Sequence, residues 1–342
     1  MNDVRITLAH GAGGHAMRRL IEDVFVRAFD NPMLDALEDQ AVIPLAEVQA
    51  AGDRLAFTTD SYVVDPLFFP GGDIGTLAVA GTVNDLAMSG ARPLYLSCAM
   101  ILEEGLELQT LRRVVASMRR VADDAGVRVV TGDTKVVERG AADKLFINTA
   151  GVGVVPQGVS ISSRNARPGD AVIVNGTLGD HGTAILIARG RLALESAIES
   201  DCQPLASLVA AMLLACPDIH CLRDATRGGV ATVLNEFARG SQVAIRIREA
   251  ALPMRDEVKG ACEILGLDPL YLANEGKLVA VIPAAAAPRV LAAMRAHPAG
   301  RHAAIIGEVL DAPSRGLVVL QTSFGGERIV DMLVGDQLPR IC

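Results

Sequence analysis

Residues 73–102 read DIGTLAVAGTVNDLAMSGARPLYLSCAMIL, and this stretch carries the clearest helix and strand patterns of the chain. Asp73 stands at the head of a long apolar run that closes on Gly90, a pattern that predicts a helix over 73–90. The nearly continuous apolar run 94–102 predicts a buried strand. A long helix that leads directly into a buried strand indicates a domain in which helices pack against a sheet.

Both flanks continue this mixture of helices and strands. Upstream, 4–9 is predicted as a strand, and 42–48 and 54–60 as two strands of a hairpin. Downstream, an apolar stripe at helical spacing predicts a helix over 108–125. The other predicted elements are strands at 127–131, 144–155, 171–175, 219–222, 243–248, 277–282, 304–310 and 317–321, and helices at 183–189, 204–215, 255–265 and 285–296, with one more ending near 239. This content predicts the α+β (mixed α/β) class and not a regular parallel alternation.

A polar stretch between residues 157 and 169 divides the chain into two comparable halves. A chain of 342 residues is long enough for two domains of about 150 residues each. We therefore expect an N-terminal domain over 1–157, a C-terminal domain over 158–330 and a mobile tail over 331–342.

Composition and charge exclude several classes of function. The chain has 3% aromatic residues and a net charge of -8, so it lacks the basic stripe and the stacking rings of a nucleic-acid binder. The N-terminus shows no signal peptide, and no run reaches the ~18 apolar residues of a membrane helix. These features predict a cytoplasmic protein with reduced thiols. Cys216, His220 and Cys221 cluster without a second pair at zinc spacing and are expected to be ordinary buried side chains.

The glycine-rich turn at 10–14, His-Gly-Ala-Gly-Gly, leads into a helical pattern and is a candidate anion-binding loop. Gly11, Gly13 and Ala16 also fit the dinucleotide pattern G-x-G-x-x-A. The predicted hairpin at 42–60 argues against a Rossmann fold, which would need a helix there. The chain has no P-loop, nucleophile elbow or zinc-protease motif. Any ATP would therefore be bound through glycine turns and carboxylates.

Four aspartates, Asp60, Asp85, Asp133 and Asp224, are candidate metal ligands. Three of them lie at or just after predicted strand ends beside Thr, Ser or Gly, and Asp85 lies inside a predicted helix. Carboxylates in such places can hold Mg²⁺ against nucleotide phosphates. Lys135, two residues after Asp133, is placed to neutralise a transferring phosphoryl group. Each aspartate taken singly is also compatible with a turn or capping role.

The chain ends in Leu338-Pro-Arg-Ile-Cys342, which places a thiol at the terminus. The twelve residues from Asp331 to Cys342 span roughly 40 Å when extended, so the sulfur can reach a partner or a pocket on the same protein. Taken alone, the terminus is equally compatible with a frayed end.

The motifs together resemble the carbamoyl dehydratase family of hydrogenase maturation proteins (HypE), within the superfamily of aminoimidazole ribonucleotide synthetase and selenophosphate synthetase. The matching segments span nearly the whole chain and are 10–14, Thr58-Thr-Asp-Ser61, Phe69-Pro-Gly-Gly-Asp-Ile-Gly75, Gly81-Thr-Val-Asn-Asp-Leu86, Gly132-Asp-Thr-Lys135, Arg223-Asp-Ala-Thr-Arg-Gly-Gly229, Asn274-Glu-Gly276 and the tail. The terminal Pro-Arg-Ile-Cys is specific to this family. The chain departs from it at Ala225, where a proline is expected.

The resemblance implies a two-domain architecture like that of aminoimidazole ribonucleotide synthetase, with a flexible C-terminal tail. The N-terminal domain would bind ATP and form a homodimer, and the C-terminal domain would cover the nucleotide. Cys342 would receive a carbamoyl group from the carbamoyltransferase HypF. ATP-dependent dehydration would convert this group to a thiocyanate, and its cyanide would pass to iron on a HypC–HypD scaffold that builds the [NiFe]-hydrogenase centre.

The resemblance also implies the site. Cys342 would carry the reacting group, Lys135 would stabilise phosphate and the developing oxyanion, and Glu275 would accept a proton. Without the resemblance, Glu275 is equally compatible with a salt bridge to Lys277. Asp60, Asp85, Asp133 and Asp224 would hold Mg²⁺–ATP. The other residues expected at the nucleotide are His10, Gly13, Asp73, Asn84, Thr134 and Thr226. His10 is also compatible with merely ending the first strand.

Two other functions are compatible with the sequence. The protein could be a synthetase or kinase of the same superfamily that acts on a free small molecule, in which case the tail would be dispensable. The protein could instead be a non-catalytic thiol carrier or redox adaptor, in which case it would not bind Mg²⁺–ATP. The terminal thiol argues against the synthetase or kinase.

Overall fold

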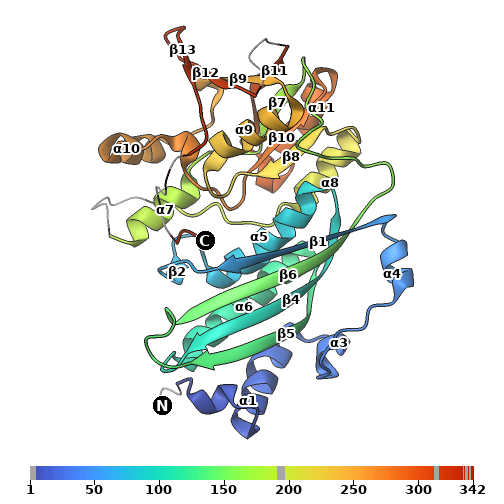
Figure 1. Ribbon diagram of the computed structural model, residues 1–342, viewed down its shortest axis with the longest axis vertical. Coiled ribbons are helices and arrows are strands. Elements are labelled where there is room, and N and C mark those ends of the chain that lie inside the picture. Colours follow the sequence, from blue (N-terminus) through green and yellow to red (C-terminus); the bar gives the residue numbers. More distant parts are fainter. Residues whose placement is uncertain (1–4, 191–196, 312–315, 334, 336–337, 339) are drawn as a thin grey trace.

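The computed structural model describes residues 5–190, 197–311, 316–333, 335, 338 and 340–342. Two sheets, each with its own helices, lie one above the other along the long axis of the molecule (Figure 1). The strands of the first sheet come from residues before 156, and those of the second from residues after 170. The C-terminus lies where the two parts meet, near α5, β2 and α7 (Figure 1).

The first sheet has the order β1-β6-β4-β5, in which only β4 and β5 run parallel. Its strands are β1 (Arg54–Tyr62), β4 (Arg92–Glu103), β5 (Arg128–Val137) and β6 (Leu145–Val155). Helices α5 (Ile74–Met88) and α6 (Leu108–Ala125) pack on one face of this sheet, where Leu77 and Val114 are buried in the same core. The opposite face is not covered by these helices.

The second sheet has seven strands in the order β13-β12-β9-β11-β7-β10-β8. Its strands are β7 (Ala171–Val174), β8 (Cys221–Asp224), β9 (Ala244–Arg248), β10 (Leu278–Ile282), β11 (Ala304–Leu310), β12 (Val318–Gln321) and β13 (Glu327–Ile329). Helix α9 (Gly229–Ser241) packs in one core, and α8 (Ala206–Ala215) and α11 (Ala287–Ala296) pack in another. The sheet therefore carries helices on both faces.

Short elements complete the chain. The remaining helices are η1 (Leu8–Gly11), α1 (His15–Leu20), η2 (Ile21–Val26), α2 (Arg27–Phe29), α3 (Pro32–Asp35), α4 (Leu45–Gln49), α7 (Asp180–Ala188), η3 (Glu249–Ala251), α10 (Asp256–Leu265), η4 (Pro269–Tyr271), η5 (Ala284–Ala286) and η6 (Pro298–Gly300). Strands β2 (Phe68–Phe69) and β3 (Gly72–Asp73) form a small hairpin before α5. None of the described helices combines the length and the apolar character needed to cross a membrane.

The mixed α/β class and most predicted elements are confirmed, but two predicted strands are wrong. Of the predicted strand 4–9, residue 4 lies outside the described residues. Among the described ones Arg5 forms an isolated bridge with Glu107, and Leu8–Gly11 forms a 3₁₀ helix. Residues 45–49 form helix α4, which begins after Pro44, a residue well suited to a helix start. Strand β1 therefore forms no hairpin with 42–48 and instead pairs antiparallel with β6.

The glycine turn at 10–14 is not part of a Rossmann fold. It leads into α1, as predicted, and η1 lies against β5. The sheet beside it is mostly antiparallel, whereas a Rossmann fold needs parallel strands joined by helices.

Candidate functional site

A cavity of about 540 Å³ lies along β1, which is an edge strand of the first sheet. Its lining includes Thr58 from β1, Asp85 from α5, Ser162 from the connection between the sheets and Asp224 from β8. This volume is within the usual range for small-molecule sites, and the cavity is lined from both halves of the chain. A larger cavity of about 640 Å³ near α8 is mainly apolar and contains no carboxylate.

Three of the four predicted aspartates converge at this edge of the sheet. Thr58 Oγ1 donates to Asp85 Oδ2 at 2.9 Å, so the even-numbered side chains of β1, including Asp60, face α5. Burial raises the pKa of Asp85, and the charge of Asp60 adds to the shift. Burial also raises the pKa of Asp224 to about 7, and here the charge of Asp85 adds to the shift.

These three carboxylates suit a divalent cation. They repel one another in a half-buried place, and a cation between them would remove the repulsion. Among the described residues, no three acidic, His or Cys side chains are already gathered as a metal cluster. Mg²⁺ does not require such a cage, because it usually takes one or two carboxylates and completes its shell with water and substrate phosphates.

Glu275 lies deeper, 3% exposed, and its Oε1 has no hydrogen-bond partner in the part of the chain that the structure describes. Burial, and then the negative charge of Asp201, hold its pKa well above the usual range. The alternative salt bridge from Glu275 to Lys277 is not formed, because Lys277 Nζ lies 2.8 Å from Asp201 Oδ2 instead. A carboxylate without a counter-ion and with a raised pKa is suited to take up a proton near neutral pH.

Two of the residues predicted at the nucleotide, Asp73 and Asn84, make hydrogen bonds within the protein. Asp73 caps α5, accepting from Thr76 N at 2.9 Å and from Ser117 Oγ at 2.6 Å. Asn84 is buried in α5 and joins the two halves of the chain. Its amide nitrogen lies 3.1 Å from Gln203 O and 3.3 Å from Glu275 O, and its oxygen accepts from Leu205 N at 2.7 Å. Asn84 therefore positions the Glu275 backbone.

The terminal cysteine is docked in its own subunit, beside Glu275. Val63 N donates to the backbone oxygen of Cys342 at 3.1 Å, and Ile341 is 3% exposed. Burial raises the pKa of the Cys342 thiol, and the charge of Glu275 adds to the shift, whereas the charge of Arg227 opposes it. The structure thus brings Cys342, Glu275, Asp60 and Asp224 into one electrostatic cluster.

Asp133, Thr134 and Lys135 lie apart from this cluster. They belong to β5, which is three strands away from β1, roughly 14 Å at the usual spacing. The buried Thr134 pairs with Met100 of the neighbouring strand β4, and Met100 faces the core that the helices cover. Because successive side chains of a strand point to opposite faces, Asp133 and Lys135 project from the uncovered face. There Lys135 Nζ lies 2.6 Å from Asp133 Oδ2, and both side chains are exposed. Within one chain, Lys135 therefore cannot reach the β1 edge of the sheet, where Asp60, Asp85 and Asp224 lie.

The remaining predicted site residues lie either near β5, with Asp133 and Lys135, or near Asp224 at the β1 edge of the sheet. His10 and Gly13 lie at the β5 side of the sheet, where the His10 ring nitrogen Nδ1 accepts from Thr7 N at 3.0 Å. Thr226 lies in the turn between β8 and α9, two residues after Asp224.

Sequence reasoning missed the segment 200–202, which has no motif of its own. Glycines from two recognised motifs approach it closely. A Cβ on Gly276 would stand 1.9 Å from Asp201 O, and one on Gly71 would stand 2.7 Å from Ser200 N. The glycines at 71 and 276 were the available signal, because they allow backbone to approach where a side chain would clash.

Comparisons with known proteins agree with this geometry. Residues 37–155 match the family AIR synthase related protein, N-terminal domain, and residues 167–319 match AIR synthase related protein, C-terminal domain. The chain is 59% identical to the carbamoyl dehydratase HypE of Rhodobacter capsulatus, over 100% of this chain and 99% of that protein.

Solved structures of HypE proteins share the fold of this chain. A crystal structure of the hydrogenase maturation protein HypE in complex with ATP superimposes with a TM-score of 0.93 at 53% identity, covering 98% of this chain and 99% of that one. The HypE chain of a HypE–HypF complex superimposes with a TM-score of 0.79 at 48% identity, covering 92% and 99%. The chain therefore belongs to the HypE family of carbamoyl dehydratases, within the AIR synthase related proteins.

Proposed function

We propose that the protein uses ATP to dehydrate a carboxamide carried on its own Cys342, giving a thiocyanate. The observation that carries this proposal is the docking of Cys342 beside Glu275, at the edge of the sheet where Asp60, Asp85 and Asp224 converge. A kinase or synthetase of the same superfamily that acts on a free substrate would have no use for its own terminal thiol at this place.

The residues fit the chemistry of dehydration. The carboxamide oxygen forms a bond to the γ-phosphorus of ATP as the bond to ADP breaks, and Glu275 takes one amide proton. The carbon–oxygen bond then breaks and phosphate leaves with the bonding electrons. The second amide proton passes to the departing phosphate as the nitrile forms. Tethering through sulfur makes the encounter intramolecular. Arg227, whose charge acts on both Glu275 and Cys342, is suited to hold a phosphate oxygen.

Asp60, Asp85 and Asp224 would hold Mg²⁺ with the ATP phosphates, and the metal would supply charge compensation for the triphosphate. The cavity along β1 would take the nucleotide. The N-terminal domain, 1–157, would thus provide most of the ATP site, and the C-terminal domain, 158–330, would cover it through Asp224 and Glu275.

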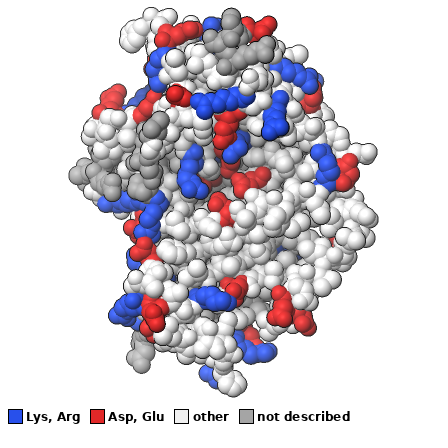
Figure 2. Space-filling model, viewed as in Figure 1, with Lys and Arg blue, Asp and Glu red and all other residues white. Residues whose placement is uncertain are grey.

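In a homodimer, Asp133 and Lys135 would contribute to the ATP site of the partner subunit. The uncovered face of the first sheet is apolar, with Leu55 64% and Phe57 71% exposed on the edge strand. Figure 2 shows that the surface over this part of the molecule carries few charged side chains. A second copy packed on this face would cover the apolar row and would carry its own Lys135 and Asp133 toward the β1 edge of its partner.

The proposed partners follow from the family. The carbamoyltransferase HypF would load Cys342, and a HypC–HypD complex would receive the cyanide as a ligand for the iron of [NiFe]-hydrogenase. Both exchanges would draw Cys342 out of its docked place, because the residue is partly buried there against the core. We place these reactions in the cytoplasm.

Two variants test the proposal. Cys342→Ala is expected to bind Mg²⁺–ATP with wild-type affinity in calorimetry and to form no modified tail. A chain truncated after Pro339 is expected to be inactive. If the truncated chain turned over ATP and a free small substrate at full rate, the superfamily kinase or synthetase would be the better interpretation. Failure of the wild-type protein to bind Mg²⁺–ATP would favour the non-catalytic thiol carrier.

A further inference from the structure

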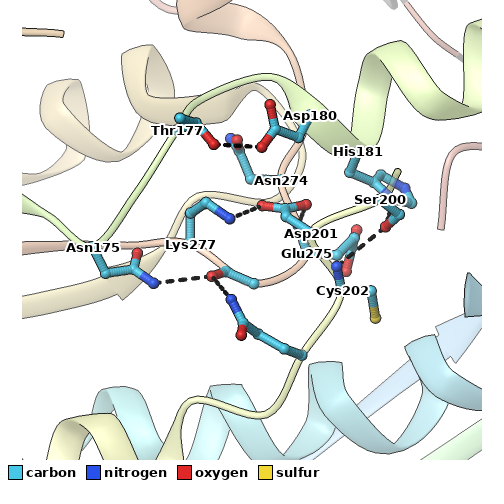
Figure 3. Close-up of polar contacts among 12 residues, drawn as sticks. Asn175, Thr177, Asp180, His181, Ser200, Asp201, Cys202, Asn274, Glu275 and Lys277 are labelled. Carbon is cyan, nitrogen blue, oxygen red and sulfur yellow. Dashed lines mark hydrogen bonds and ion pairs between the residues drawn. The ribbon is translucent and has the colours of Figure 1, made fainter. Parts of the chain in front are cut away.

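A fully buried histidine, His181 of α7, makes direct contact with the docked tail. Its ring nitrogen Nε2 lies 2.9 Å from the backbone oxygen of Ile341, one peptide unit before the Cys342 Cα. Its Nδ1 lies 2.8 Å from Ser200 Oγ (Figure 3). The ring of Phe69 meets the imidazole edge to face, with the ring centres 5.6 Å apart.

The partners determine the tautomer of His181. A carbonyl oxygen only accepts, so Nε2 must carry the proton that is donated to Ile341. In the neutral ring Nδ1 then accepts, and Ser200 donates its hydroxyl proton to it. Burial lowers the pKa of His181, which favours this neutral form. The imidazole is therefore oriented by Ser200 so that its one N–H is aimed at the tail.

The same segment that orients His181 also holds the proton acceptor. Ser200 N donates to Pro70 O at 2.8 Å, and its hydroxyl oxygen accepts from Cys202 N at 3.2 Å. The next residue, Asp201, accepts from Glu275 N at 3.1 Å and pairs with Lys277 (Figure 3). The tail contact and the Glu275 backbone are thus fixed by two adjacent residues.

We propose that His181 is a positioning residue for dehydration, which holds the Ile341 carbonyl and so places the group on Cys342 against Glu275. This inference rests on the proposed function. Val63 fixes the tail on the other side of Cys342, through its terminal oxygen. Arg340, one residue before Ile341, is also held, through Val63 O and Asp143, so loss of the His181 contact frees the peptide unit next to Cys342 and not the whole tail. A misplacement of about 1 Å at a reacting group can cost roughly a hundredfold in rate.

Two amide substitutions separate this role from a general effect on folding. In His181→Gln the amide nitrogen stands where Nε2 stood and can still donate to Ile341. In His181→Asn the nitrogen stands where Nδ1 stood and cannot reach the tail. His220→Asn is the matched control, because His220 is also a buried histidine of the second half, and an amide nitrogen at the place of its Nδ1 can keep the hydrogen bond to Asp170.

The experiment follows the full chain with the carbamoyltransferase, carbamoyl phosphate and ATP, and reads the C-terminal peptide by mass spectrometry. We expect all variants to accept the carbamoyl group as the wild type does. His181→Asn should then form thiocyanate about 10- to 100-fold more slowly, whereas His181→Gln and His220→Asn should stay within about threefold of wild type. In the absence of ATP, Cys342 of His181→Asn should react faster with a thiol reagent, since its tail leaves the pocket more often.

The inference is overturned if His181→Asn dehydrates at the wild-type rate, or if His181→Gln is as slow as His181→Asn. Unchanged thiol labelling in His181→Asn would also contradict it, and this arm does not depend on catalysis. A wild-type protein that keeps its carboxamide in the presence of ATP would refute the proposed function itself and not the contact of His181 with the tail.

Discussion

Lys277 Nζ lies 2.8 Å from Asp201 Oδ2, and this buried pair keeps the lysine from Glu275, whose Oε1 has no hydrogen-bond partner among the described residues. Both members of the pair are nearly inaccessible to solvent. After burial, the negative charge of Asp201 contributes most to raising the pKa of Glu275, and the charge of Arg227 opposes this shift. The Lys277–Asp201 pair therefore has two effects: it removes the lysine from Glu275 and it holds the Glu275 backbone through Asp201.

Replacing Asp201 should destabilise the protein strongly. Asp201→Ala leaves Lys277 buried without a partner, which typically costs about 3 to 5 kcal/mol of the free energy of unfolding. Denaturant titration measures this change. The control is Asp256→Ala, since Asp256 forms an exposed pair with Lys259 that should contribute less than about 1 kcal/mol. Equal stability of the two variants would contradict the importance of the buried pair.

Replacing Glu275 by Gln should block dehydration without blocking nucleotide binding. The amide cannot take the proton from the carboxamide, and loss of a general base costs roughly 10²- to 10⁴-fold. Mass spectrometry should find the carboxamide accumulating on Cys342. Because burial raises the pKa of Glu275, the wild-type rate should increase with pH as this carboxyl loses its proton. A wild-type rate of thiocyanate formation in Glu275→Gln would remove Glu275 from the mechanism.

Mg²⁺–ATP should bind more tightly as the pH rises through about 7. Burial raises the pKa of Asp224 to about 7, so below this value the carboxyl is mostly protonated and must lose its proton before it can hold a cation. Calorimetry at a series of pH values measures the change. Asp224→Asn should bind more weakly and with little dependence on pH. An affinity of the wild type that stayed constant from pH 6 to 8 would be inconsistent with Asp224 as a metal ligand.

Mixed dimers should restore activity if Lys135 acts on the partner subunit. Lys135→Ala and Glu275→Gln are each expected to be inactive alone. In a mixed dimer, one site combines the intact Glu275 of one subunit with the intact Lys135 of the other. Random exchange makes half of the dimers mixed, each with one working site, so the mixture should reach about a quarter of the wild-type rate. No recovery after subunit exchange would place Lys135 outside the site.

Local patterns predicted the parts of the fold that are governed by local rules. The apolar stripe and Gly126 predicted helix 108–125, and α6 has these bounds, with Gly126 in the left-handed conformation that ends it. Strand 42–48 was wrong because an apolar segment of seven residues does not distinguish a strand from a short helix. The helix there follows Pro44 and leaves most of its residues exposed.

The arrangement of the site depended on contacts that local patterns do not record. Asp201 lies 76 residues from Lys277 and has no motif around it, so the pair could not be predicted. Likewise Asp133 and Asp60 look alike in sequence, since both are near strand ends beside Thr. Strand order and the alternation of side chains place them at opposite edges and on opposite faces of one sheet.

Whether ATP converts a carboxamide on Cys342 to a thiocyanate is the decisive question for the proposed reaction. The wild-type protein is incubated with the carbamoyltransferase, carbamoyl phosphate and ATP, and the C-terminal peptide is analysed by mass spectrometry. The account predicts a peptide that first gains a carbamoyl group and then loses one water on addition of ATP, as expected for a thiocyanate on Cys342. A tail that stays unmodified, or that keeps its carboxamide when ATP is present, would contradict it.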